Sequence, residues 1–379
     1  MKKVYSAALA AWLISPSFLY AAETDPVQVE GQLNLGVRSV NGGEDSAYFH
    51  EFKDESDGTF GSLLLDAYKK NYYLGAEAEN FGLTDQYYSL HAGDYRNFSF
   101  KGFYNEIPHN ISFDALTPFT GIGTKSLNLP VQPAPTNTGL WQQFDYDFTR
   151  KQYGGEMKIN LNSPFYIKVG AKREERDGVK PLGAGYFTPG AVEMPEPIDY
   201  KTDDLTVEGG YLSKDLVASV SGYLSSFNNK NLYLAWEDPF ATAFPADFPT
   251  LSTLPPNNDY GKVVGEATWK ALPMSSVLAV RGSYSHLEND FTYSDVGLSN
   301  FTTAVLGANG FDFTTPTFDG SIIYYNGSAT LTSRPMRSVD TRLYYNYLDK
   351  ANDSTVITTI EPSGDVATNS DTLFGYRKN

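Results

Sequence analysis

The sequence predicts an all-β protein, a transmembrane antiparallel up-and-down β-barrel with about 13–14 strands in this chain. Three observations lead to this fold class. Short runs of alternating apolar and polar residues fill the chain from Val27 onward, the N-terminus has the form of an export signal, and tight turns alternate with mostly longer connections. Strands of this kind present one face to lipid and the other to water or a polar partner.

The N-terminal segment, residues 1–22, is predicted to be a signal peptide. A basic pair at residues 2–3 precedes an apolar stretch at 4–20, and two alanines at 21–22 offer a cleavage site. This order is typical of secretory signals, and the short stretch followed at once by acidic residues disfavours a membrane anchor. Residues 23–379 are therefore expected to form the exported barrel in the bacterial outer membrane.

Alternation defines the individual strands. In the first, Val29, Leu33 and Leu35 point to one face, while Glu30 and Asn34 point to the other. About thirteen complete strands follow from this pattern, each near the length of a tilted barrel strand. They are expected at 27–38, 60–69, 72–80, 86–93, 98–105, 153–161, 165–175, 205–211, 216–227, 261–271, 277–285, 321–331 and 339–349.

Charged residues indicate which face of a strand lines the lumen. Glu77 and Glu79 alternate with apolar residues, His91 lies on the polar side of the following strand, and a later strand carries Lys168 and Lys172. A charge against lipid is costly. These five residues are therefore predicted to face the lumen and to contact whatever occupies it.

Connection lengths give the barrel an orientation. Tight turns are expected at 69–71, 94–97, 162–164, 213–215, 273–275 and 333–337, and the connections at 41–59, 106–152, 176–204, 228–260, 286–320 and 350–371 are long. Only 81–85 is short where a long loop is expected. Short turns lie on the periplasmic side of such barrels and long loops lie outside, so the mature N-terminus is expected in the periplasm. A soluble β-sandwich or propeller is not expected to keep this asymmetry.

Charge and composition narrow the function. The formal charge is −16, and loss of the signal peptide would remove two lysines and no acid. This balance disfavours nucleic acid and anionic ligands. The chain has no cysteine, which excludes disulfides, thiolate metal sites and covalent haem attachment through Cys-x-x-Cys-His. Any haem must be carried by another protein.

Several segments between and at the ends of the strands resemble a known family. They read ENFGLTDQYYSLHAGDY at 79–95, EIPHNISFDALTPF at 106–119, GIGTKSLNLP at 121–130, GVKPLG at 178–183, MPEPIDYKTDDL at 194–205 and SSFNNKNLYLAWEDPF at 225–240. In this order they resemble the decahaem-associated outer-membrane proteins of the MtrB/PioB type. The resemblance covers essentially the whole mature chain.

The resemblance implies a large outer-membrane barrel that sheaths a periplasmic multihaem c-type cytochrome. Electrons would pass between the periplasm and an outer-surface cytochrome, a mineral or a soluble metal, in extracellular metal reduction or oxidation. The chain itself would bind no cofactor, because the partner carries the haem. Some members have a cysteine pair near the mature N-terminus that this chain lacks. Complete members are much longer, and the further strand that begins at residue 372 stops at 379, so we expect a truncated part of a larger barrel.

Other readings of single residues are weaker. The acidic run 54–58 has oxygen ligands for calcium, but its spacing fits no complete motif, so an exposed solvated loop is expected. Haem ligation by His91 is less favoured than a polar lumen lining, and His109 is expected to serve loop packing. The charged run 172–177 is expected at the outer rim, where it could contact lipopolysaccharide phosphates, although a solvated rim is the default.

No catalytic, cofactor-binding or metal-binding residues are predicted. The sequence contains no nucleophile elbow or phosphate-cradling loop, and it places no serine, histidine and acid together. An enzyme, such as an outer-membrane hydrolase, is therefore disfavoured. The alternative to the cytochrome sheath is a general or substrate-selective diffusion porin.

Overall fold

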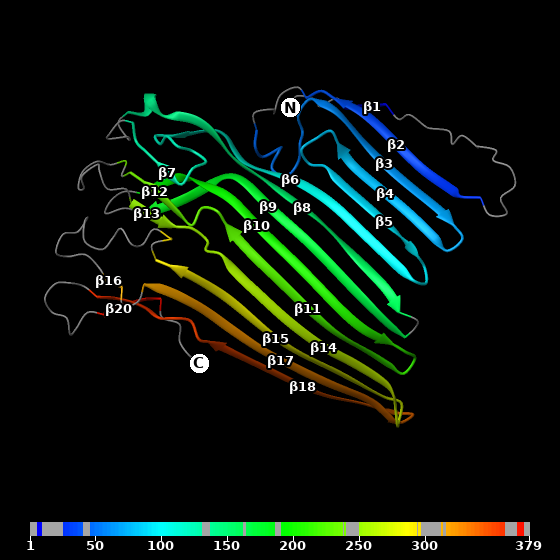
Figure 1. Ribbon diagram of the computed structural model, residues 1–379. Helices are drawn as coiled ribbons and strands as arrows, with labels where there is room; N and C mark the ends of the chain where they lie inside the picture. Colours follow the sequence, from blue (N-terminus) through cyan, green and yellow to red (C-terminus); the bar gives the residue numbers. More distant parts are fainter. Residues whose placement is uncertain are drawn as a thin grey trace.

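The computed structural model describes residues 6–9, 26–40, 46–130, 137–161, 164–185, 191–237, 239, 250–293, 295–296, 312–313, 316–360 and 370–374. Within these residues the chain forms one large antiparallel sheet of fourteen strands, which follow one another along the wall in chain order. Figure 1 shows the strands as a curved wall. The strands of this sheet are β1 (Ser6–Leu9), β2 (Gln28–Arg38), β3 (Gly58–Lys69), β4 (Tyr72–Phe81), β5 (Tyr87–Asp94), β6 (Phe98–Thr117), β8 (Gln142–Leu161), β9 (Phe165–Gly185), β10 (Ala191–Leu212), β11 (Leu216–Asn229), β14 (Asn258–Leu272), β15 (Ser276–Thr292), β17 (Thr317–Met336) and β18 (Val339–Asn352).

The all-β class and the up-and-down strand order are confirmed. Each of the thirteen predicted strands corresponds to one strand between β2 and β18 within the described part of the chain. Short turns gather at one end of the wall and long connections at the other (Figure 1). No pairing among the described residues joins β18 to β1 or β2, so the described sheet is open.

Two smaller sheets lie at the long-connection end. One is formed by β7 (Ser126–Leu127), β12 (Tyr233–Trp236) and β13 (Thr250–Thr253), and the other by β16 (Asp312–Phe313), β19 (Ile357–Ile360) and β20 (Ser370–Phe374). A short 3₁₀ helix, η2 (Thr138–Leu140), precedes β8. No helix in the described ranges has the length and apolar character needed to cross a membrane.

Four strands in the middle of the wall are longer than the sequence pattern predicts. β6 continues to residue 117 and β9 to residue 185, whereas β8 begins as early as residue 142 and β10 as early as residue 191. The sequence predicts loops in these stretches. Beyond the apolar band no lipid requires one face to be apolar, so the alternation that marks a strand weakens although the pairing continues.

Prolines also concealed the end of the β9–β10 hairpin, because they are read as strand breakers. Pro195 pairs directly with Pro181. Among the described residues no other strand pairs with β10 at this level, since β11 pairs only as far as Tyr200 and β8 pairs with β9 only as far as Gly178. The hairpin is a two-stranded ribbon here, so a missing N–H on its outer edge costs no ladder hydrogen bond.

β1 lies inside the predicted signal peptide. It pairs with the last four residues of β2, from Leu35 to Arg38, at the edge of the sheet. The signal peptide and its cleavage remain a prediction.

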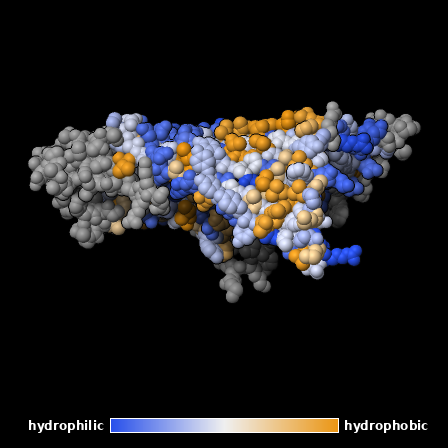
Figure 2. All heavy atoms as spheres, turned by 90° about the horizontal axis from the view of Figure 1, so that it is seen from below, coloured by the Kyte–Doolittle hydropathy of each residue, from blue (hydrophilic) through white to orange (hydrophobic). Residues whose placement is uncertain are grey.

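The wall has an apolar face and a polar face. Directly paired residues in neighbouring strands share a face, so the register extends each face across the sheet. We call the face that carries Leu74 and Val169 the apolar face, and the face that carries Glu77 and Lys168 the polar face. Many large side chains on the apolar face are solvent-exposed, among them Val207 at 45%. Figure 2 shows hydrophobic residues in a band across the strands, with hydrophilic residues on both sides of it.

A row of tyrosines marks the outer edge of the apolar band. Tyr88, Tyr104 and Tyr153 are paired in register on neighbouring strands, and their ring centroids are 6.1 and 6.5 Å apart. The hydroxyl of Tyr104 donates to Glu106 at 2.8 Å, and that of Tyr153 donates to Glu175 at 3.2 Å. Rings against the apolar band with hydroxyls on polar groups are typical of an interfacial aromatic girdle.

Candidate functional site: the polar face and its outer rim

The structure places the five predicted lumen residues on one face. Glu77 and Glu79 on β4 share the polar face with His91 on β5, which is paired with Gly75. The register through β6 and β8 leads from His91 to the face of Lys168 and Lys172 on β9. The acidic pair and His91 therefore lie together, and the two lysines form a separate group several strands away. Their contact with a partner remains a prediction.

The first strands give the polar face an acidic character. Glu30 on β2 is paired with Asp66 on β3, and Glu77 and Glu79 follow on β4. Within this part of the chain, Ser89 donates to Glu77 at 3.3 Å, and the Nε2 atom of His91 lies 3.9 Å from Asp66. We call Glu30, Asp66, Glu77 and Glu79 the acidic strip.

His91 lies flat across its neighbour because that neighbour is glycine. A Cβ added at Gly75 would collide with the imidazole ring of His91 and would also approach Asp66 to 2.8 Å. The ring is also 6.0 Å from that of Tyr73. His91 is thus packed into the polar face with its side chain 47% exposed, and its place in a lumen remains a prediction.

The middle of the polar face is neutralised by ion pairs. Lys168 Nζ lies 2.8 Å from Glu156 Oε2, and Lys172 Nζ lies 3.0 Å from Asp204 Oδ2. Farther along, Arg281 pairs with Glu266 at 3.1 Å. The Lys168–Glu156 and Arg281–Glu266 pairs, whose side chains are one-third or more exposed, contribute only about 0–1 kcal/mol each. Within each pair the two charges neutralise one another.

The outer rim above this face holds a compact hydrophobic core. It consists of the buried side chains Phe119, Leu127, Met194, Leu234, Trp236 and Leu254, with Leu129, Leu182, Ala184 and Val192 packed against them. We call this core, with the β7–β12–β13 sheet, the cap. Trp236 is 1% exposed and donates from Nε1 to Ser252 at 3.0 Å.

The cap lies on the same side of the wall as the polar face. The β9–β10 pairing is unbroken from the turn end to Gly185, so Leu182 and Met194 share a face with Lys172 and Asp204, from which they are separated by even numbers of residues. The cap therefore covers the outer end of the polar face, and it is seen beside the outer ends of β9 and β10 in Figure 1.

A buried polar network lies just beneath the cap. Glu196 is 2% exposed; it accepts a hydrogen bond from the Tyr200 hydroxyl at 3.0 Å and pairs with Lys180 at 3.2 Å. Burial, followed by the negative charge of Glu196, raises the pKa of Tyr200 above its ordinary value. With one hydrogen bond and one ion pair, this buried carboxylate is satisfied within the fold.

A second segment, residues 46–57 between β2 and β3, also folds over the polar face, and we call it the flap. Phe52 of the flap meets His109 of β6 edge-on, with ring centroids 5.0 Å apart, and His109 stacks on Phe148 of β8 at 4.5 Å. The Nδ2 atom of Asn110 donates to the carbonyl of buried His50 at 2.7 Å. His109 thus serves packing, as expected.

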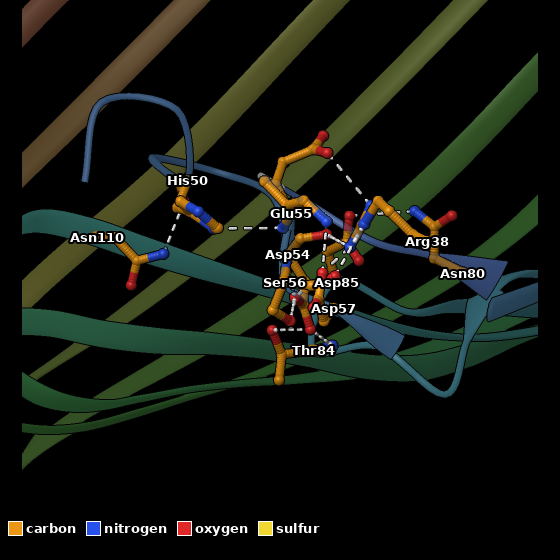
Figure 3. Close-up of polar contacts among 11 residues, drawn as sticks. Arg38, His50, Asp54, Glu55, Ser56, Asp57, Asn80, Thr84, Asp85 and Asn110 are labelled. Carbon is orange, nitrogen blue, oxygen red and sulfur yellow. Dashed lines mark hydrogen bonds and ion pairs between the residues drawn. The ribbon is translucent and has the colours of Figure 1, made fainter. Parts of the chain in front are cut away.

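Hydrogen bonds hold the acidic run of the flap in place. Figure 3 shows Arg38 directed at the flap, where it pairs with Glu55 at 3.2 Å and also contacts Asp54. The carboxylate of Asp54 accepts from the Thr84 backbone at 2.9 Å and from the Ser56 backbone at 3.0 Å. Burial raises the pKa of Asp54, but these hydrogen bonds outweigh it and hold the pKa below its ordinary value.

Residues 54–57 of the acidic run are therefore tied into the flap, while Ser56 and Asp57 remain exposed, as expected for a solvated loop. The tie to Arg38 could not be read from the sequence, because Arg38 lies at the end of a different strand. Among the described residues, no group of three or more His, Asp or Glu side chains has the geometry of a metal site.

The charged run 172–177 also forms specific pairs at the rim. Glu174 contacts both Arg150 at 2.9 Å and Arg176 at 2.6 Å, while Arg173 faces the opposite side and pairs with Asp203. His286, on the apolar side of β15, pairs with Glu288 at 2.9 Å and contacts the Ser321 hydroxyl at 2.9 Å.

Sequence reasoning missed the cap altogether. Its core residues Phe119, Leu127, Met194 and Trp236 all lie where the sequence predicts connections between strands. Large apolar residues in loops of an exported chain are themselves a signal, because a loop that carries them must bury them against something.

Comparison with known proteins agrees with this architecture. The family model described as "Putative outer membrane beta-barrel porin, MtrB/PioB" matches residues 40–378. The chain is 23% identical over 340 residues to the outer membrane protein MtrB of Shewanella baltica, strain OS185, and the match covers 86% of this chain and 46% of that protein. The chain thus spans about half the length of this curated relative.

Two solved structures of OmpT from Vibrio cholerae are similar at low scores. The in-vitro folded form has a TM-score of 0.28 at 10% identity, covering 94% of this chain and 96% of that chain. The outer-membrane expressed form has a TM-score of 0.27 at 10% identity, covering 89% of this chain and 99% of that chain.

Proposed function

We propose a function from the premise that this chain belongs to the MtrB/PioB family of outer-membrane β-barrel porins: its wall sheaths a periplasmic multihaem c-type cytochrome and supports electron transfer across the outer membrane. The protein is located in the outer membrane. The terminal reaction is extracellular reduction or oxidation of a metal.

One observation carries this proposal: the described residues cover the polar face at one end only. The cap and the flap fold over its outer end, and no described segment folds over the half nearer the short turns. In this barrel class the short turns lie in the periplasm. A periplasmic protein can thus reach the polar face from the side of the short turns, while the cap and the flap obstruct the outer end.

The chemistry of the wall suits a passive sheath. The ion-paired part of the polar face presents hydrated, mutually neutralised charges, and the acidic strip offers carboxylates for a basic surface of the partner. The apolar face separates this lining from lipid. The chain itself binds no cofactor in this proposal, because the haem belongs to the cytochrome.

Co-purification tests the proposal directly. An affinity-tagged chain, extracted from outer membranes of its own host in mild detergent, is expected to bring down a haem-staining protein with the visible spectrum of a c-type cytochrome. Untagged cells processed in parallel control for adventitious haem. A haem-free preparation that conducts ions freely in planar bilayers would contradict the sheath and support the diffusion porin.

A further inference from the structure

The apolar face contains a hollow that the proposed sheath does not use. It has a volume of about 840 Å³ and extends across six neighbouring strands from β8 to β15. Two consecutive rows of paired residues on the apolar face form most of its lining. The hollow lies at the level of Tyr153, the last tyrosine of the aromatic row. It is therefore placed at the outer interface between hydrocarbon and water.

The inner row is a floor of small and apolar residues. It runs in register through Gly155, Ala171, Leu205, Leu224 and Gly261 and ends at His286. A Cβ at Gly261 would meet only the end of the Leu224 side chain, at an ordinary 3.6 Å. A larger residue would therefore fit at position 261 without a clash, and the glycine leaves this space open.

The outer row is polar. It runs in register through Tyr153, Arg173, Asp203, Ser226, Asp259 and Glu288. Arg173 is bound by Asp203 through two hydrogen bonds, of 2.5 and 2.8 Å. Its positive charge is therefore already neutralised. Glu288 is contacted by His286 Nδ1 at 2.9 Å, and with a neutral imidazole there the carboxylates of Asp259 and Glu288 leave this end of the row negatively charged.

We propose that this hollow binds a membrane lipid with an amine-bearing head group. The acyl chain lies on the floor, where burial of apolar surface is favourable, and the ammonium group lies near Asp259 and Glu288. An anionic head group would meet two carboxylates, because the one nearby guanidinium is held by Asp203. The proposal requires only the outer-membrane location and is independent of any cytochrome.

Native mass spectrometry of the detergent-extracted protein tests this proposal. The protein is incubated with equal amounts of phosphatidylethanolamine and phosphatidylglycerol that have identical acyl chains. We expect about three- to fivefold more bound phosphatidylethanolamine, the ratio given by one exposed ion pair of up to about 1 kcal/mol. Equal binding of the two lipids would overturn the head-group assignment.

Substitutions separate the floor from the polar row. Ala171→Trp fills the floor and is expected to reduce binding of both lipids, whereas Ala329→Trp, on the apolar face of β17 outside the hollow, is a matched control that retains binding. Gly261→Leu repeats the test if the first variant does not assemble. Asp259→Asn combined with Glu288→Gln is expected to keep lipid binding but lose the preference. Binding by the floor variants equal to that of the control would overturn the site.

Discussion

The two ends of the same strands bury their apolar side chains in different surroundings. Along β10, residues 194–198 are buried, and Met194 among them packs in the cap core, whereas Leu205 and Val207 are 40% and 45% exposed on the apolar face. The outer end has a conventional protein core, and the inner end has its apolar side chains turned towards lipid. The loss of unfolding free energy caused by a substitution should therefore depend on the end of the strand and on the face at which the residue lies.

The largest effect is expected where the cap is truncated at its centre. Trp236→Ala removes a fully buried side chain, so the local unfolding free energy of the cap should fall by about 3–5 kcal/mol. Limited proteolysis and hydrogen exchange of residues 119–129 and 250–254 measure this loss. Trp269→Ala, at a position 49% exposed on the apolar face, should leave exchange in those segments unchanged; equal exposure of the cap by both variants would refute a separate core.

A lysine introduced at the membrane level should destabilise the protein far more on the apolar face than on the polar face. Val207→Lys places an ammonium group on the apolar face and is expected to cost about 2–4 kcal/mol, whereas Thr206→Lys places it on the polar face at little cost. Denaturant unfolding in lipid vesicles gives both values. Similar costs for the two variants would show that the faces are assigned wrongly.

The membrane-level part of this comparison could be predicted from the sequence, because lipid imposes strict alternation on one face. Glu77, Glu79 and Lys168 were placed on a common face by that rule alone. The cap could not be predicted, since its core joins Phe119 and Leu127 of one connection to Trp236 of another, and only tertiary structure brings them together. For the same reason the tie between Arg38 and the flap was not foreseen.

The flap should respond to acid. Burial, with the guanidinium groups of Arg150 and Arg176, holds the pKa of His109 below its ordinary value of 6.5. Because the folded flap lowers the pKa of His109, the neutral imidazole stabilises the folded flap at pH values above the free pKa of histidine. This stabilisation is lost as the pH falls below 6.5. The carboxylate of Asp54 remains ionised in this range because its pKa is lowered.

Hydrogen exchange of residues 46–57 should therefore become faster, relative to the intrinsic rate, between pH 7.5 and pH 5. His109→Phe preserves an aromatic ring against Phe52 and Phe148 but cannot be protonated, so its flap should show no such acceleration. An identical pH response in this variant would assign the titration to another group. The β4–β5 hairpin serves as an internal reference.

The smallest effect is expected for the ion pairs of the polar face. Lys168→Met and Glu156→Gln should each change stability little, and their coupling in a double-mutant cycle should be about 0–1 kcal/mol, because both side chains are about one-third or more exposed. The Lys180–Glu196 pair under the cap, studied in the same way through Lys180→Met and Glu196→Gln, should show a larger coupling, because its carboxylate is buried, with Glu196 only 2% exposed. Equal couplings would mean that water reaches both ends of the polar face alike. The proposed difference in solvent access between the capped outer end and the rest of the polar face would then be wrong.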